Sequence, residues 1–211
     1  MVAQDEAQHR AGPLIVWING AFGAGKTTAA YELHRRLPGS LVFDPEEAGF
    51  YIRARLPKHL HGDDFQDYPM WRSINREMLA YLAENHPGPI IVPMTVVSER
   101  YMDELVGALR SSGVRVDHYA LTASRQTLLR RLRSRWESER SWAAQQIDRC
   151  LAGLAGETFD VHIQTDGMNA SEVVARIAEL SGLALTPDRR GPLKRGWDRL
   201  RTKAGHIRFG R

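Results

Sequence analysis

The sequence has one cysteine, Cys150, in 211 residues, which excludes an internal disulfide framework. Cysteine and histidine are nowhere spaced as in a zinc site. No apolar run approaches the roughly 18 residues of a membrane-spanning helix, and residues 1–12 are polar, without the apolar stretch of a signal peptide. Hydrophobic residues make up 43% and charged residues 26%, an ordinary globular balance. We therefore expect a cytoplasmic protein in which Cys150 is a buried, inert thiol.

The net charge of +4 is unevenly distributed along the chain. Residues 185–211 contain nine Lys or Arg and two Asp, a net charge of +7, whereas residues 1–184 contain 20 basic and 23 acidic residues, a net charge of −3. The basic character thus belongs to one end, which argues against nucleic acid as a partner of the whole surface. We expect a main domain at 13–184 and a basic tail at 185–211.

Short apolar segments alternate with stretches of helical periodicity. This alternation predicts an α/β fold, a three-layer arrangement in which helices cover both faces of a parallel sheet. The helix expected at 70–84 has Trp71, Ile74, Met78 and Leu82 spaced for one buried face. The five strands are expected at 14–18, 41–43, 90–95, 114–121 and 161–165.

A glycine-rich loop lies between the first expected strand and the first expected helix. Its backbone N–H groups and the start of the helix would surround a phosphate, which predicts a P-loop nucleotide site. Lys26 would reach the β- and γ-phosphates, and the Thr27 hydroxyl would bind Mg²⁺. The expected nucleotide-binding residues are Gly20, Ala21, Phe22, Gly23, Ala24, Gly25, Lys26, Thr27 and Thr28.

Two absences narrow the class of P-loop protein. The third expected strand ends in Pro93-Met94-Thr95, without the acidic pair of motor ATPases, and no Asn-Lys-x-Asp run is present to read guanine. The chain is also short for a motor protein. The sequence therefore favours a compact small-molecule kinase that uses ATP.

Asp44 follows the second expected strand, at the edge of the sheet where ligands bind in such folds. There it could accept a proton from a substrate hydroxyl or help to hold Mg²⁺. The alternative is a helix cap, because Asp44-Pro45-Glu46 also suits the start of a helix.

Arg131 and Arg135 lie four residues apart in a basic helix expected at 125–137. Paired guanidinium groups on one face would stabilise charge on a transferred phosphoryl group, so we expect a helical lid over the nucleotide. The alternative is a solvated basic face.

The segment from Asp63 to Tyr68 is the expected wall of the acceptor site, and Trp71 and Arg72 follow it directly. Its aromatic rings could stack on a base or sugar, and its carboxylates could bind hydroxyls. The alternative is a surface loop whose aromatic residues pack into the core. Together with Asp44, the expected substrate-binding residues are Asp63, Asp64, Phe65, Tyr68, Trp71, Arg72 and Thr95.

The Leu-x-x-Arg-Leu-x-x-Arg pattern at 128–135 resembles the lid helix of nucleoside-monophosphate and shikimate-type kinases. More narrowly, the chain resembles the bacterial tunicamycin-resistance proteins after residue 13. The resemblance rests on Trp17-Ile18-Asn19-Gly20-Ala21-Phe22-Gly23, Asp63-Asp64-Phe65-Gln66, Val92-Pro93-Met94-Thr95 and Ser141-Trp142-Ala143-Ala144, among other stretches.

This resemblance implies a five-stranded P-loop fold with strand order 2-3-1-4-5, ATP binding, and resistance to a nucleoside antibiotic. Tunicamycin contains a uridine and sugar hydroxyls, which suit an aromatic and carboxylate-lined site. Three functions stay open at this point: phosphorylation of tunicamycin, its sequestration without chemistry, and the phosphorylation of an ordinary nucleoside or nucleotide.

The tail has one apolar stripe of helical spacing in an otherwise basic segment. Such a helix, expected within 190–208, can lie on an anionic membrane surface. The alternative is a helix packed on the acidic body of the protein. The stripe consists of Leu193, Trp197, Leu200, Ala204 and Ile207.

Overall fold

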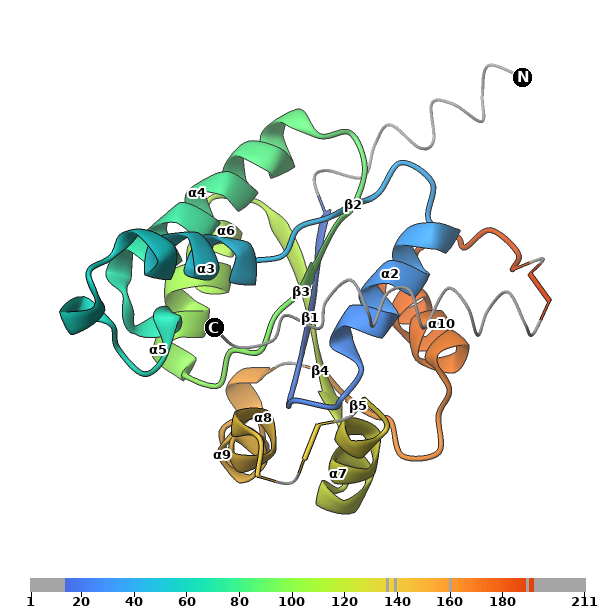
Figure 1. Ribbon diagram of the computed structural model, residues 1–211. Helices are drawn as coiled ribbons and strands as arrows, with labels where there is room; N and C mark the ends of the chain where they lie inside the picture. Colours follow the sequence, from blue (N-terminus) through green and yellow to red (C-terminus); the bar gives the residue numbers. More distant parts are fainter. Residues whose placement is uncertain (1–13, 136, 139, 160, 189, 192–211) are drawn as a thin grey trace.

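The computed structural model describes residues 14–135, 137, 138, 140–159, 161–188, 190 and 191. Its centre is a five-stranded sheet with the order β2-β3-β1-β4-β5, in which each neighbouring pair is parallel (Figure 1). This confirms the α/β fold and the strand order. The strands are β1 Leu14–Gly20, β2 Leu41–Val42, β3 Ile90–Pro93, β4 Arg115–Thr122 and β5 Val161–Gln164.

Helices cover both faces of the sheet (Figure 1). They are α2 Lys26–Arg36, α3 Glu46–Arg55, α4 Pro69–Asn85, α5 Glu99–Met102, the π-helical η3 Asp103–Gly107, α6 Ala108–Ser111, α7 Arg125–Arg133, α8 Trp142–Gln145, α9 Ile147–Gly153 and α10 Ala170–Ser181. Three short 3₁₀ turns complete the described elements: η1 Lys58–Leu60, η2 Phe65–Asp67 and η4 Glu157–Phe159.

β1 is buried along its whole length because it lies between β3 and β4 and has helices on both sides. Val16 and Ile18 belong to one core, together with residues of α2, α7, α9 and α10. Ile15 and Trp17 point the other way, into a core shared with α3, α4 and the 99–111 segment. Because successive side chains of a strand point to opposite faces of the sheet, the single apolar run of β1 contributes to both cores. The end of β1, where the P-loop begins, is thereby held between the two helical layers.

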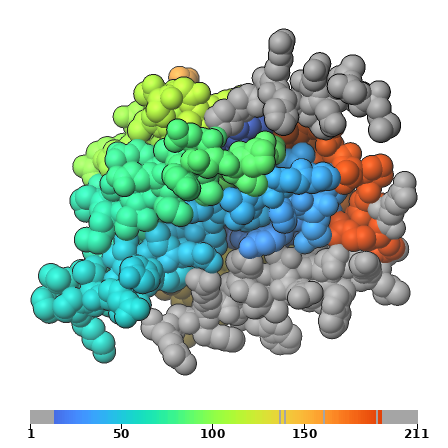
Figure 2. Space-filling model, turned by 90° about the horizontal axis from the view of Figure 1, so that it is seen from above, coloured from blue at the N-terminus to red at the C-terminus, as the bar shows by residue number. Residues whose placement is uncertain are grey.

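The buried face of α4 differs from the prediction. Trp71 is buried, but Ile74 and Met78 are 41% and 46% exposed, whereas Leu79 is fully buried. Asn75 is fully buried as well, and its side-chain amide donates to the Trp71 carbonyl oxygen one turn earlier in the helix, at 2.8 Å. Figure 2 shows α3 and α4, coloured cyan to green, as one continuous face of the molecule.

The chain returns to α2 after α10. The N–H and Oγ1 of Thr186 donate to the carbonyl oxygen of Arg36 at 2.8 and 3.0 Å, and Arg190 forms an ion pair with Glu32. The first residues of the expected tail thus contact the body. The amphipathic helix expected within 190–208 lies outside the described residues from 192 on, so it and the domain boundary stay predictions. Among the described helices, none combines the length and apolar character needed to cross a bilayer.

Candidate active site

The P-loop joins the end of β1 to the start of α2, as the glycine pattern predicts. Gly20 and Gly23 have positive φ angles of 147° and 84°. A Cβ atom at Gly20 would lie 2.7 Å from the carbonyl oxygen of Leu121, and one at Gly23 would lie 2.9 Å from that of Leu128. Both positions therefore need glycine, and the loop is packed directly against β4 and α7.

Lys26 lies buried in the first turn of α2. Its Nζ donates to the carbonyl oxygen of Ala21 at 3.2 Å and lies 5.4 Å from the centre of the Phe22 ring. Burial lowers the pKa of Lys26 from 10.5 to about 8, while the charges of Glu46 and Asp44 act to raise it. Burial disfavours the protonated form of the amine, and a bound phosphate would favour it again because opposite charges attract. Lys26 is therefore well placed to bind an anion.

A cavity of about 220 Å³ opens beside the P-loop. It is lined by the loop, by the start of α2, by the end of β4, by α7 and the two residues after it, and by residues between 165 and 173 that follow β5. Of the expected nucleotide-binding residues, Gly23, Ala24, Gly25, Thr28, Arg131 and Arg135 line it. Thr27 is half-buried in the same first turn of α2, next to Lys26. Its concave shape and position identify this cavity as the candidate nucleotide site.

Arg131 is held in place by backbone and hydroxyl acceptors. Its guanidinium donates to Thr165 Oγ1 at 3.0 Å, to the Thr165 carbonyl oxygen at 2.7 Å and to the Ala24 carbonyl oxygen at 3.3 Å. Burial lowers the pKa of Arg131. Arg131 therefore connects α7, the end of β5 and the P-loop, and it forms a fixed wall of the cavity.

Arg135 lies beyond the end of α7, which stops at Arg133 instead of reaching 137 as predicted. Its backbone N–H donates to the Leu132 carbonyl oxygen at 2.8 Å in the turn that follows. Burial lowers the pKa of Arg135, the charge of Glu137 acts against that shift, and Arg135 in turn acts to lower the pKa of Lys26. The two arginines thus face one cavity, although they do not share one helix.

Asp44 follows β2, as predicted, and its Oδ1 accepts a hydrogen bond from the Glu46 N–H at 3.0 Å. This contact supports the alternative interpretation of Asp44 as a cap at the start of α3. Asp44 also acts on the charge of Lys26, so capping does not remove it from the phosphate site. Glu46, in the first turn of α3, has the larger effect on Lys26 and was not predicted. The Asp44-x-Glu46 spacing at the strand end was the available signal.

Asp63 is exposed, and Asp64 connects three elements of the expected acceptor wall. Asp64 Oδ1 accepts from the Gln66 N–H at 3.0 Å, which caps η2, and Oδ2 accepts from Arg149 of α9 at 3.3 Å. The Gln66 side chain donates to the Thr95 carbonyl oxygen at 3.1 Å. These contacts bring the 63–68 segment, the end of β3 and α9 together.

Most of the remaining expected substrate residues have interior roles. Trp71 is 0% exposed and donates from Nε1 to the Pro45 carbonyl oxygen at 2.9 Å. Arg72 is buried in an ion pair with Glu104. The structure therefore corrects the direct contacts expected for Trp71 and Arg72, because closed packing leaves their side chains no face for a ligand.

Phe65, Tyr68 and Thr95 are also committed to the fold. Phe65 packs between the rings of Phe50 and Trp71, and the Tyr68 hydroxyl donates to the Leu60 carbonyl oxygen at 3.2 Å. Thr95 is buried, and its Oγ1 donates to the carbonyl oxygen of Gly20 at 2.8 Å. Thr95 thus anchors the P-loop to the end of β3.

Trp142, by contrast, is 53% exposed and contacts the P-loop from outside. Its ring meets Phe22 edge to face, with ring centres 5.0 Å apart. Cys150 is fully buried, and burial raises its pKa, while the charge of Lys26 and a hydrogen bond with the Phe22 backbone act to lower it. The buried thiol was predicted, whereas the place of Trp142 at the P-loop was not.

Comparison with known proteins supports this description. The family model described as "AAA domain" matches residues 15–156. No curated protein sequence matches the chain. A gluconokinase from Sinorhizobium meliloti 1021 is 19% identical, with a TM-score of 0.58 over 82% of this chain and 96% of that one. A shikimate kinase from Bacteroides thetaiotaomicron is 18% identical, with a TM-score of 0.56 over 81% and 99%. These two share the fold.

The tunicamycin resistance protein of Deinococcus radiodurans is more similar. It is 37% identical, with a TM-score of 0.72, and the match covers 84% of this chain and 99% of that one. The predicted resemblance is therefore confirmed, and the chain belongs to the AAA-domain family of P-loop proteins and, within it, to the tunicamycin-resistance proteins.

Proposed function

We propose that the chain is an ATP-dependent phosphotransferase that gives resistance to tunicamycin, or to a related nucleoside antibiotic, by phosphorylating one of its hydroxyl groups. The observation that carries this proposal is the burial of Lys26 in a glycine-rich loop, between the end of β1 and the start of α2. The negative charges of Glu46 and Asp44, at the next strand–helix junction, act to raise the pKa of this lysine. A phosphate-binding cation beside candidate proton acceptors is what transfer to an alcohol requires.

The residues present fit both ATP and Mg²⁺. Gly20 and Gly23 of the P-loop leave no room for Cβ atoms, and the adjoining cavity is bounded by Arg131 and Arg135. Thr27 and Asp44 offer the hydroxyl and carboxylate oxygens that Mg²⁺ prefers. ATP supplies the transferable phosphoryl group when it is bound.

Each side chain then has a separate task. Lys26 and Arg135 bind phosphate oxygens, and Arg131 holds the wall of the cavity. Asp44 would accept the proton of the acceptor hydroxyl while that oxygen bonds to the γ-phosphorus of ATP, the bond from this phosphorus to the β–γ bridging oxygen breaks, and ADP leaves. We place this activity in the cytoplasm, where the basic tail within 190–208 would hold the protein against an anionic membrane surface.

Sequestration of tunicamycin without transfer is the second candidate. The bond from the Glu46 N–H to Asp44 Oδ1 favours it, because it gives this carboxylate a structural role that needs no proton transfer. Resistance of cells that express wild-type protein or Asp44→Asn separates the two candidates. Phosphoryl transfer predicts that Asp44→Asn abolishes resistance at equal expression. Retained resistance would support sequestration and contradict the proposal.

A further inference from the structure

Trp142 is an exposed aromatic residue placed next to the phosphate-binding lysine. Its ring centre lies 5.0 Å from that of Phe22, and the Phe22 ring centre lies 5.4 Å from the Lys26 amine. The centre of the Trp142 ring is therefore within about 10 Å of the Lys26 amine. One edge contact with Phe22 leaves much of the indole accessible, since the residue is 53% exposed.

Other residues hold α8 in place. Ser141 caps the helix by accepting from the Ala144 N–H at 3.2 Å, and Ala144 is buried in the core. Ile147, at the start of α9, is fully buried in the same core. The helix pair is thus anchored by its inner face, and the core does not need a tryptophan at 142.

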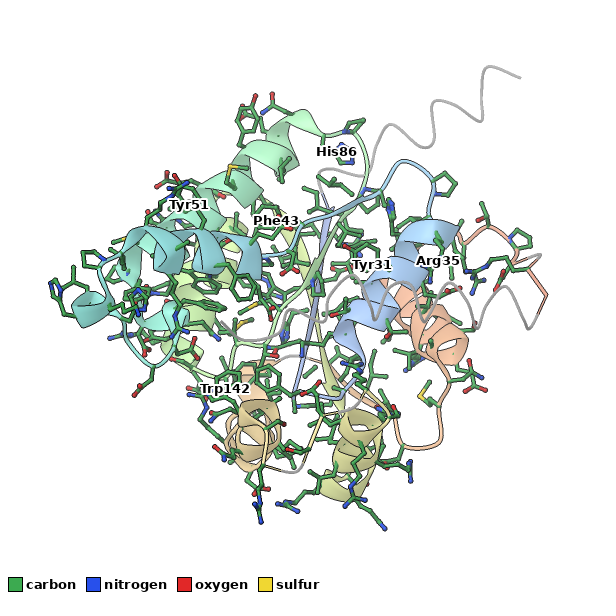
Figure 3. All side chains as sticks on the ribbon, in the orientation of Figure 1. Tyr31, Arg35, Phe43, Tyr51, His86 and Trp142 are labelled. Carbon is green, nitrogen blue, oxygen red and sulfur yellow. The ribbon has the colours of Figure 1, made fainter. Side chains whose placement is uncertain are left out.

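The position of Trp142 is on the acceptor side of the P-loop. Among the described residues, the lining of the nucleotide cavity comes from residues 23–29, from 121 and from the 131–135 and 165–173 segments, and it includes neither Phe22 nor Trp142. The α8–α9 pair instead meets the other wall, because Arg149 of α9 pairs with Asp64 at 3.3 Å. Figure 3 shows Trp142 on α8, at the end of the sheet where β1 leads into the P-loop.

We propose that Trp142, supported by Phe22, stacks on the nucleobase of the acceptor, so that the protein selects nucleosides over sugars without a base. This inference rests on the proposed function. Of the rings expected to stack on the acceptor, Trp71 is fully buried, whereas Phe65 and Tyr68 are half-buried and held by contacts within the protein. Trp142, at 53% exposure, is the more accessible ring. Every nucleobase has a planar face suited to such stacking. A base on Trp142 would direct its attached sugar hydroxyls toward Lys26.

The test is calorimetric binding of tunicamycin to the full-length chain in the presence of a non-hydrolysable ATP analogue. Trp142→Ala is expected to weaken tunicamycin binding by about tenfold or more, and Trp142→Phe to stay within about threefold of wild type. Tyr81→Ala, which removes an exposed ring on α4, is the matched control and should leave binding unchanged. Uridine should compete with tunicamycin, and N-acetylglucosamine should not.

Binding separates this inference from the proposed function. Wild-type binding that depends on Trp142, without any phosphorylated product, would refute phosphoryl transfer and support stacking. Wild-type affinity in Trp142→Ala, or competition by N-acetylglucosamine and not by uridine, would overturn stacking even if phosphate is transferred. Loss of affinity for the ATP analogue in Trp142→Ala would also overturn it, because the ring would then support the P-loop instead of the acceptor.

Discussion

Arg131 donates two hydrogen bonds to Thr165, one to Oγ1 at 3.0 Å and one to the carbonyl oxygen at 2.7 Å. These bonds join α7 to the residue that follows β5, at the wall of the nucleotide cavity. Arg135 faces the same cavity and acts on Lys26 through its charge. The two arginines therefore differ in their contacts: Arg131 is fixed in the cavity wall, whereas Arg135 faces the cavity and has the phosphate-binding role in the proposed function.

Arg131→Ala is expected to lower the free energy of unfolding by about 1.5 to 3 kcal/mol, since it removes hydrogen bonds made by a charged group. Arg135→Ala should leave stability unchanged or slightly higher, because burial of this cation is unfavourable. It should lower kcat by about 10²- to 10³-fold, as expected for loss of a group that stabilises transition-state charge. Urea unfolding and steady-state kinetics measure the two effects. Equal losses of stability in both variants would contradict the separate roles of Arg131 and Arg135.

Two substitutions of Asp44 separate its capping role from its chemical role. Asparagine can still accept the hydrogen bond from the Glu46 N–H but cannot accept a proton. Asp44→Asn should therefore stay within about 0.5 kcal/mol of wild-type stability and lose turnover, while Asp44→Ala should also lose about 1 kcal/mol. Thermal unfolding and ATP-analogue binding check this. Turnover that survives Asp44→Asn would remove Asp44 from the reaction.

The lowered pKa of Lys26 predicts a pH dependence of nucleotide affinity. The free protein has a pKa of about 8 at this position, so its amine loses charge as the pH rises through 8. Affinity for the ATP analogue should fall above that pH, by at most about tenfold per pH unit. Lys26→Met should bind weakly with little change over the same range. Wild-type affinity that stays constant from pH 7 to 10 would contradict the assigned environment.

The lowered pKa of Lys26 also predicts how the free energy of unfolding changes with pH. Between pH 8 and 10.5 the unfolded chain keeps the Lys26 proton that the folded chain has released, so the Lys26 contribution to the free energy of unfolding rises with pH in that window. The difference between wild type and Lys26→Met isolates this contribution from other titrating groups.

Neighbouring residues on α4 provide a test of its observed face. Leu79 is fully buried, and Met78 is 46% exposed. Leu79→Ala should cost about 2 to 5 kcal/mol, whereas Met78→Ala should stay within about 0.5 kcal/mol. Urea denaturation of both variants measures the difference. A larger loss for Met78→Ala would restore the face predicted from the sequence.

The sequence predicted the P-loop, the strands and the position of Asp44 because each depends on local pattern. Strand ends were placed within one or two residues, since they follow from short apolar runs bounded by polar or turn-forming residues. The strand order came from the resemblance, because a pattern of alternating elements does not determine which strands are neighbours.

The buried face of α4 could not be read from local pattern. The helix has two apolar stripes, and polar residues such as Arg72 and Asn75 lie on the buried side. These polar side chains can be buried because they have polar partners on other elements, far away in the sequence. Arg72 pairs with Glu104, and Asn75 donates to the Pro45 carbonyl oxygen. The same long-range packing hides Trp71, while Trp142 gains its place at the P-loop from a contact with Phe22, 120 residues away. Contacts between residues so far apart in the sequence cannot be predicted from composition or from the spacing of neighbouring residues.

The proposed phosphotransferase function requires the P-loop to hold a phosphate donor for tunicamycin. Mass spectrometry of tunicamycin after incubation with purified protein, ATP and Mg²⁺ is the decisive measurement, with Asp44→Asn as the paired control. We predict one added phosphate with the wild-type protein and none with Asp44→Asn. Unmodified tunicamycin, under conditions where the wild-type protein binds both ATP and tunicamycin, would contradict the claim.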